Sequence, residues 1–179
     1  MRRQYPPREY LRECLDYDPE TGSFSWKHRP QEHFKTLGGY RKFNLSHAGE
    51  PALTSDDGQG YLHGKISFEG RGYKLKCHIV AWLIHSDDDL PEIIDHANRD
   101  RTDNRWVNLR AASHADNSRN RRSLNPHGKG IKPRPNGKFQ AHITIDGRKK
   151  TLGTFTTLVE ANVAYQQAAI THHGNFARF

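Results

Sequence analysis

The stretch Asp95-His96-Ala97-Asn98-Arg99-Asp100-Arg101-Thr102-Asp103-Asn104 is the most informative part of this 179-residue sequence. Asn108 and Asn117 follow it at wider spacing, with further arginines between them. Asp is a hard oxygen ligand for Mg²⁺ or Mn²⁺, and His can accept a proton near neutral pH. Arg binds phosphate oxygens through a planar fork of N–H groups. This combination of side chains is suited to cleaving a phosphodiester backbone.

The elements predicted around this stretch place its polar residues at two junctions. Residues 92–97 predict a strand, 98–107 a polar loop and 109–112 a second strand. Ser113 predicts the N-cap of a helix that runs to about residue 122, with Asn117 in its first turn. In a regular strand Asp95 and His96 would point to opposite faces. Both can serve one site if the strand ends or bends there.

The residues before this region predict short elements on either side of an irregular stretch. A helix is expected at 8–15, a strand at 23–27, a β-hairpin at 61–68 and 73–77, and an apolar helix at 78–85. Residues 28–59 are rich in Gly, His and Ser, so we expect irregular structure there, with at most a short strand. The N-terminal variable region, residues 1–59, receives no chemical role.

The residues after it predict a second small α+β module behind a linker at 123–129. A first strand is expected at 130–135. Residues 139–145 alternate apolar and polar side chains, and Asp146-Gly147 is a strong hairpin turn before a return strand at 148–155. Thr157 and Glu160 form a capping box for a helix to about residue 172. The fold class is therefore α+β.

Charge is concentrated in one part of the chain. The formal net charge is 28 − 20 = +8. Residues 105–150 hold 12 Lys and Arg but only Asp116 and Asp146, which gives this window +10 and the remainder −2. Such a block favours a polyanionic partner, with a solvated basic surface as the alternative.

Composition also bounds the cellular setting and the metal chemistry. Cys14 and Cys77 lie far apart, so a Cys₄ zinc site is excluded and reduced thiols in a cytoplasmic protein are the better interpretation. No apolar run of about 18 residues predicts a membrane span, and the N-terminus has no secretory signal pattern. We therefore expect a cytoplasmic protein, in the host cytoplasm if it is phage-encoded.

The same polar residues admit a purely structural interpretation. Asp and Asn often form turns and helix caps, and we favour that interpretation for Asn98, Asp100, Asp103 and Asn104. For the other positions the chemistry favours function. Asp95 and Asn117 can ligate a divalent cation, and Asn108 can bond either the backbone or the imidazole of His96.

Residues 60–122 resemble the HNH endonucleases, in the variant found in phage and intron homing enzymes. The matching residues are His78 with Ile79-Val80-Ala81-Trp82-Leu83-Ile84, then Ile94-Asp95-His96, Asn98, Asp100, Asn104, Asn108-Leu109-Arg110, Asn117 and Asn120. The resemblance implies a ββα-metal fold with one Mg²⁺ or Mn²⁺. It implies His96 as general base, Asn108 as the residue that orients it, and Asp95 and Asn117 as metal ligands. Members stapled by zinc carry two CxxC pairs, which this chain lacks, so no structural zinc is expected.

Residues 130–179 resemble an AP2-type DNA-binding domain, which reads the major groove with a three-stranded sheet. The matching residues include Gly137-Lys138-Phe139, Gly147-Arg148-Lys149, Gly153-Thr154-Phe155, Ala164-Tyr165 and Gly174-Asn175-Phe176-Ala177. The two-residue turn pairs Thr144 with Lys149 and His142 with Thr151, which places these side chains on one sheet face. The DNA-contacting residues predicted from this face, from the first strand and from the basic end of the preceding helix are Arg119, Arg121, Arg122, Arg134, Gln140, His142, Thr144, Lys149 and Thr151.

Together these patterns predict a metal-dependent, sequence-targeted DNA endonuclease of the HNH homing type. Its expected partner is double-stranded DNA, with no membrane and no small-molecule substrate. A monomer that nicks and a dimer that breaks both strands remain open. The alternatives are a non-catalytic AP2-type regulator and a nuclease without sequence preference.

Overall fold

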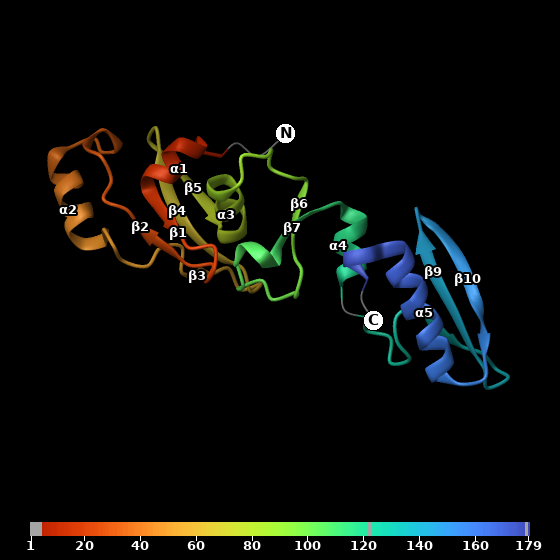
Figure 1. Ribbon diagram of the computed structural model, residues 1–179. Helices are drawn as coiled ribbons and strands as arrows, with labels where there is room; N and C mark the ends of the chain where they lie inside the picture. Colours follow the sequence, from red (N-terminus) through yellow and green to blue (C-terminus); the bar gives the residue numbers. More distant parts are fainter. Residues whose placement is uncertain (1–4, 122, 178) are drawn as a thin grey trace. The chain divides into compact units, whose positions relative to one another are not determined.

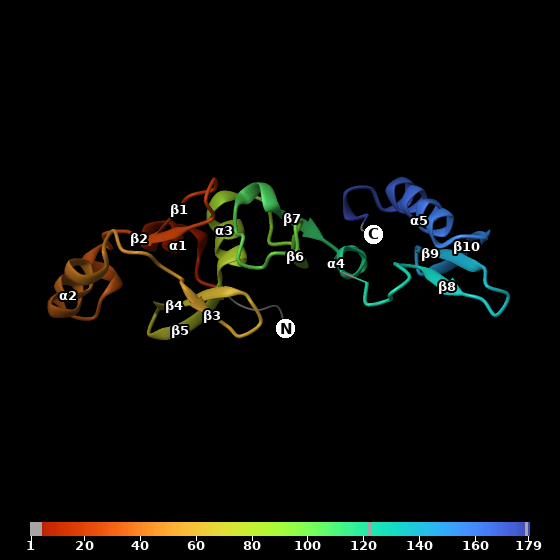
Figure 2. The ribbon, with the colours of Figure 1, turned by 90° about the horizontal axis from the view of Figure 1, so that it is seen from below.

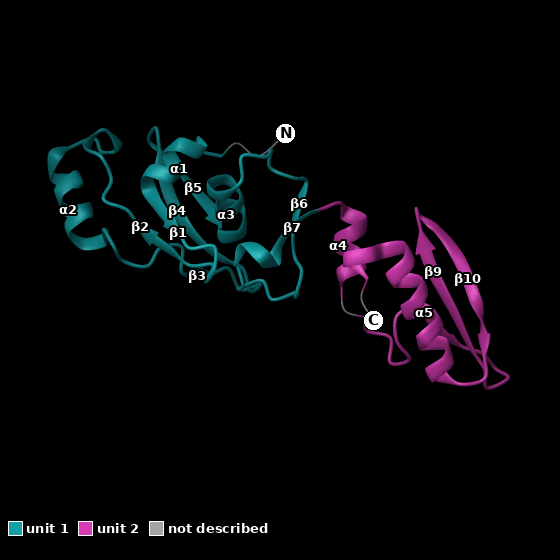
Figure 3. Ribbon diagram, viewed as in Figure 1, with its two compact units in different colours: residues 1–111 teal, residues 112–179 magenta. Residues whose placement is uncertain are grey.

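The computed structural model describes residues 5–121, 123–177 and 179 (Figure 1). The chain forms two compact units, residues 1–111 and 112–179, and each is described by itself (Figure 3). The described strands form four small sheets of two or three strands, accompanied by helices. This mixed architecture agrees with the predicted α+β class. No helix among these residues is long and apolar enough to cross a membrane.

Unit 1 begins with a helix followed directly by a short hairpin. The helix α1 (Arg8–Cys14) leads into β1 (Leu15–Tyr17), which pairs antiparallel with β2 (Phe24–Trp26). The helix and β2 were predicted, whereas β1 was missed. Leu11 and Cys14 are fully buried, so this N-terminal part contributes directly to the core of unit 1.

A helix lies inside the stretch that the sequence predicted to be irregular. After η1 (Gln31–His33), α2 (Leu37–His47) forms, and β3 (Ser55–Asp56) follows. Thr36 caps α2 by accepting a hydrogen bond from the Gly39 N–H at 3.1 Å. The guanidinium of Arg29 lies 5.0 and 5.1 Å from the ring centroids of Phe34 and Phe43. Weak apolar periodicity hid this helix, because aromatic contacts to a buried arginine replace an ordinary apolar face.

The predicted hairpin and apolar helix are confirmed. Strands β4 (Leu62–Phe68) and β5 (Arg71–Lys76) pair antiparallel, and α3 (Cys77–His85) follows without a break. Ile66 and Val80 are buried in one cluster with Leu11 and Leu15. Residues before position 60 therefore share a hydrophobic core with those after it.

The polar stretch of the sequence lies between two paired strands. Strand β6 (Ile93–His96) and strand β7 (Leu109–Ala112) form a two-stranded sheet, and η2 (Trp106–Asn108) precedes β7. Both strands were predicted. Residues 97–105, between β6 and η2, are called the 97–105 loop below.

Unit 2 contains the predicted capped helix and the three-stranded sheet. Helix α4 (His114–Asn120) has a complete capping box of Ser113 and Asp116. The sheet has the order β10-β9-β8 and is visible in Figure 2. Its strands are β8 (Ile131–Pro133), β9 (Phe139–Ile145) and β10 (Arg148–Phe155).

One face of this sheet is covered by the long helix α5 (Leu158–His173), which η3 (Gly174–Phe176) follows. Thr157 and Glu160 form the predicted capping box. Ile143 from the sheet and Ala161 and Tyr165 from the helix are buried together. The predicted pairs Thr144 with Lys149 and His142 with Thr151 are confirmed, so the register fixes which side chains lie on the opposite face.

Candidate active site

Asp95 and His96 stand at the end of β6, and both are buried, at 5% and 4% exposure. The strand ends at His96, as the sequence interpretation required. The His96 carbonyl accepts a hydrogen bond from the Arg99 N–H at 2.9 Å, so the chain turns immediately afterwards. The Asp95 carboxylate and the His96 imidazole, which are adjacent in sequence, therefore both lie at a buried strand end.

Arg110 in β7 neutralises the buried carboxylate. It donates to the Asp95 Oδ2 atom from Nε at 2.9 Å and from Nη2 at 2.7 Å. The side chains are 18% and 5% exposed, so little water screens the pair. The sequence interpretation counted Arg110 only as part of a basic surrounding, because cross-strand pairing was not visible there.

The imidazole of His96 meets the amide of Asn104, which is 1% exposed. The His96 Nε2 atom lies 3.4 Å from the Asn104 Oδ1 atom, and the Asn104 Nδ2 atom donates to the Thr102 carbonyl at 2.9 Å. Since a carbonyl oxygen only accepts, the amide nitrogen faces Thr102 and the amide oxygen faces the ring. This assigns the N–H of neutral His96 to Nε2 and leaves Nδ1 as the basic nitrogen.

Burial lowers the pKa of His96 below its ordinary value. The hydrogen bond to Asn104 and the negative charge of Asp95 oppose this effect without cancelling it. A lowered pKa leaves the imidazole unprotonated near neutral pH, which a general base requires.

Two aromatic rings lie close to the imidazole of His96. His78 in α3 lies 5.1 Å away between ring centroids, at an interplanar angle of 82°, and Tyr61 lies 6.0 Å away. Burial lowers the pKa of His78 to about 3, helped by His96 and Lys76. His78 is therefore a neutral ring at physiological pH.

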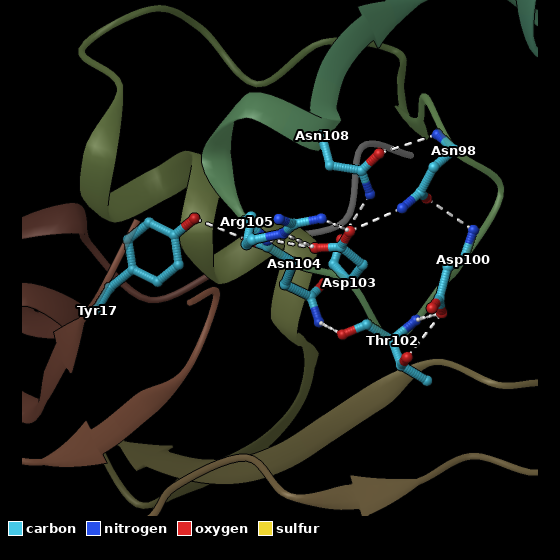
Figure 4. Close-up of polar contacts among 8 residues, drawn as sticks. All are labelled: Tyr17, Asn98, Asp100, Thr102, Asp103, Asn104, Arg105 and Asn108. Atoms are coloured by element: carbon cyan, nitrogen blue, oxygen red, sulfur yellow. Dashed lines mark hydrogen bonds and ion pairs between the residues drawn. The ribbon is translucent and has the colours of Figure 1, made fainter. Parts of the chain in front are cut away.

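Asn108 holds the backbone of the 97–105 loop (Figure 4). Its Oδ1 atom accepts from the Asn98 N–H at 2.9 Å, and its Nδ2 atom donates to the Asp103 carbonyl at 2.7 Å. Of the two partners considered for Asn108, the backbone is the one observed, and the amide that contacts His96 is that of Asn104. That Asn108 orients His96 stays a prediction. Asn108 would do so through the backbone of the 97–105 loop.

The N-terminal part of unit 1 supports this loop, which the sequence did not reveal. Tyr17 donates its hydroxyl to the Asn104 carbonyl at 2.8 Å (Figure 4), and the Trp106 N–H donates to the Pro19 carbonyl at 2.9 Å. Gly22 has a φ of +74°, and a Cβ added there would lie 2.4 Å from the Arg105 nitrogen. The turn at residues 18–22 is therefore packed directly against the loop backbone.

The two predicted metal ligands belong to different compact units of the chain. Asp95 belongs to unit 1, whereas Asn117 lies in the first turn of α4 in unit 2, with its N–H bonded to the Ser113 carbonyl. A carboxylate and an amide oxygen fit a hard cation such as Mg²⁺ or Mn²⁺. Within residues 5–121, 123–177 and 179, no three His, Cys, Asp or Glu residues gather into a metal site.

The predicted DNA-contacting residues are distributed over unit 2. Arg119 pairs with Asp116 at 2.7 Å, Arg121 is exposed, and Arg122 lies outside the described residues. Arg134 follows the end of β8 and closes a turn with Lys138. Arg134 was expected to lie in the first strand of the sheet and to join the sheet face. In the structure it lies after that strand has ended.

The sheet face opposite α5 carries the remaining predicted residues and two that were missed. The predicted residues are Gln140, His142, Thr144, Lys149 and Thr151. Lys132 and Thr154 both pair with Gln140, so they share this face. The register shifts between Thr151 and Gly153, and this bulge, invisible in the sequence, keeps Thr154 on it. Burial lowers the pKa of His142, with the charges of Lys149 and Lys132 adding to the effect.

A comparison with protein-family models gives one relevant result. Residues 75–119 match the HNH endonuclease family. No curated protein and no solved structure matches the chain. The matched segment contains β6, the 97–105 loop, β7 and most of α4. It supports an HNH nuclease that acts on DNA, and HNH nucleases generally use a divalent metal ion.

Proposed function

We propose that this protein is a metal-dependent DNA endonuclease of the HNH homing type that is directed to its target sequence by its C-terminal unit. The observation that carries the proposal is the buried Asp95–His96 pair at the end of β6, inside the matched segment. The functional regions proposed along the sequence are 1–59, 60–122, a linker at 123–129 and an AP2-like domain at 130–179. The first two regions are not separate folding units, because residues before and after position 60 share one hydrophobic core.

In the proposed reaction His96 is the general base. Its Nδ1 atom takes a proton from water, the water oxygen forms a bond to phosphorus, and the P–O3′ bond breaks. The 3′-oxygen gains a proton from solvent, which leaves 5′-phosphate and 3′-hydroxyl ends. Asn104 holds the Nε2–H of the ring, and Asn108 acts as a positioning residue that fixes the loop carrying Asn104.

Asp95 and Asn117 would hold one Mg²⁺ or Mn²⁺ through oxygen atoms. The cation supplies Lewis-acid stabilisation of the leaving oxygen when it is bound. Arg110 orients the Asp95 carboxylate by two hydrogen bonds. The proposal involves no structural zinc and no small-molecule substrate.

The C-terminal unit is proposed to bind double-stranded DNA with the sheet face opposite α5. Gln140 is suited to reading adenine, because an amide can both accept from and donate to its major-groove edge. Lys149 and Lys132 are suited to phosphate. The arginines after α4 would continue this contact along the backbone, as the basic window of the sequence indicates.

The direct test is cleavage of supercoiled plasmid with Mg²⁺ or Mn²⁺, comparing wild type with His96→Ala. We expect metal-dependent cleavage by the wild type and a loss of at least about 100-fold in the variant. Cleavage that survives His96→Ala would remove His96 from the mechanism. Absence of cleavage of any DNA, with DNA binding retained, would instead favour the non-catalytic regulator. Equal cleavage of all DNA sequences would favour a nuclease without sequence preference.

A further inference from the structure

Arg99 has an unusual backbone conformation directly after the proposed general base. Its φ is +70°, one of four positive values among the described non-glycine residues. Its N–H closes the turn onto the His96 carbonyl. The left-handed region disfavours a residue with a Cβ, and glycine would relieve this strain. Such conformations persist where neighbouring bonds impose them, and they concentrate at functional sites.

The residues on both sides of Arg99 are fixed by hydrogen bonds (Figure 4). The Asn98 N–H is held by Asn108, and the Asn98 amide donates to Asp103 at 2.7 Å. The Asn98 Oδ1 atom also accepts from the Asp100 N–H at 2.8 Å. The strained conformation is therefore imposed by the loop, which presents the Arg99 side chain at the surface.

The guanidinium of Arg99 differs from those of the neighbouring arginines in its hydrogen bonding within the described part of the chain. Five arginines lie between residues 99 and 119, and four of them donate to a protein oxygen in the structure. These four are Arg101, Arg105, Arg110 and Arg119. Arg99 is exposed, and its guanidinium makes no hydrogen bond or ion pair to any described residue.

The two carboxylates of the loop form their hydrogen bonds with donors other than the Arg99 guanidinium. Asp100 accepts from the N–H and the hydroxyl of Thr102 at 2.9 and 2.6 Å. Asp103 accepts two hydrogen bonds from Arg105, at 2.8 and 2.7 Å. A fork of N–H donors thus remains exposed one turn after His96.

We propose that Arg99 binds a phosphate oxygen of the DNA strand at the nuclease site, next to the phosphodiester attacked by the His96-activated water; this inference rests on the proposed function. The first and fourth Cα atoms of such a turn lie within about 7 Å. Arg99 and His96 are thus close enough along the chain for both side chains to reach the same stretch of one DNA strand. Guanidinium binds phosphate in a bidentate manner, which would align the strand for attack.

The test uses three variants of the full chain. Arg99→Gly removes the charge and relieves the strain, Arg99→Lys keeps the charge, and Glu69→Gly is the matched control. Glu69 also has a positive φ, +48°, in the exposed turn between β4 and β5. Duplex DNA affinity is measured against salt concentration with EDTA present, cleavage is measured with Mn²⁺, and the thermal midpoint is followed by tryptophan fluorescence.

For Arg99→Gly we expect the salt slope of log Kd to fall by about 1. We also expect kcat/KM to fall roughly 10- to 100-fold, with a thermal midpoint that is unchanged or higher. Arg99→Lys should keep the salt slope and lose only part of the cleavage rate. Glu69→Gly should change neither binding nor cleavage.

Two results would overturn the inference. An unchanged salt slope and unchanged kcat/KM in Arg99→Gly would show that Arg99 does not touch phosphate. A marked fall in its thermal midpoint would show that Arg99 is retained for structure. Failure of the proposed nuclease is distinguishable, because wild type and Glu69→Gly would then cleave nothing, while the salt slope would still report whether Arg99 meets DNA.

Discussion

Arg110 directs both Nε and Nη2 to one oxygen of Asp95, so a fixed positive charge already sits where the proposed ligand would meet a cation. Arg110 therefore has two opposing effects. It stabilises a buried carboxylate in the metal-free protein, and it competes electrostatically with any divalent ion that approaches the same group.

Replacing Arg110 with Gln should separate these effects. Without metal, the variant removes the guanidinium charge and the two hydrogen bonds that Arg110 donates to buried Asp95, and the free energy of unfolding of unit 1 should fall by about 3 kcal/mol. Urea unfolding followed by tryptophan fluorescence measures this unit alone, because Trp26, Trp82 and Trp106 all lie within it.

Added Mn²⁺ should stabilise Arg110→Gln more than wild type, since the competing charge is gone. Arg105→Gln is the matched control, because its pair with Asp103 is half exposed on the arginine side, and this substitution should have a much smaller effect on the free energy of unfolding. Equal stabilisation of wild type and Arg110→Gln by Mn²⁺ would argue against Asp95 as a ligand.

The contact between Asn104 and His96 predicts a specific pH dependence. In the proposed mechanism cleavage requires the unprotonated imidazole, so the rate should fall as the pH drops through the pKa of His96. Burial places that pKa below the ordinary 6.5, and the acidic limb of kcat/KM should therefore lie below pH 6.5. Asn104→Asp adds a negative charge that favours the protonated ring, so the limb should move to higher pH.

Profiles of kcat/KM against pH for wild type, Asn104→Asp and Asn104→Ala measure this shift. Asn104→Ala serves as the control, since it removes the contact without adding charge and should lower the rate more than it moves the limb. An identical limb in wild type and Asn104→Asp would mean that the two side chains do not interact in the active enzyme.

The turn at residues 18–22 should control the loop that it contacts. Gly22→Ala places a Cβ within 2.5 Å of backbone atoms of Asn104 and Arg105, at a φ that disfavours alanine. We expect a destabilisation of about 1–3 kcal/mol and a loss of cleavage larger than the loss of folded protein. Gly49→Ala also has a positive φ but meets no atom within 4 Å, so it controls for backbone strain alone. Similar cleavage per folded molecule in both variants would contradict this link.

Two neighbouring lysines on β10 test the DNA-binding face of unit 2. Lys149 pairs with Thr144 on the face opposite α5, whereas Lys150 pairs with buried Ile143. Lys149→Ala should weaken DNA binding and lower the salt slope by about 1. Lys150→Ala removes the same charge from the other face and should have a smaller effect. Equal losses would indicate attraction by net charge rather than recognition by the sheet.

Elements with strong local signals were predictable from the sequence. The Asp146-Gly147 turn set the β9–β10 register, and the Ser113 and Thr157 caps set the starts of α4 and α5. The end of β6 at His96 was also foreseen. In each case a few adjacent residues determine the local backbone structure.

Features that depend on distant contacts were missed. Helix α2 depends on Arg29 among aromatic rings, and the bulge at Leu152 has no local marker. The pairing of Arg110 with Asp95 and the support of Asn104 by Tyr17 join residues 15 and 87 positions apart. Residue type alone identified the polar cluster, but it could not show which amide would meet the imidazole.

The contacts of Tyr17 and Pro19 with the 97–105 loop bear on how this nuclease can be recombined with other proteins. A fragment cut at residue 60 would keep the matched segment but lose Leu11, Cys14 and Leu15 from its core, together with the hydroxyl that holds Asn104. A nuclease fragment that is fused to another protein must therefore begin near α1. Chimeras that exchange the front third of the chain would remove contacts that hold the 97–105 loop.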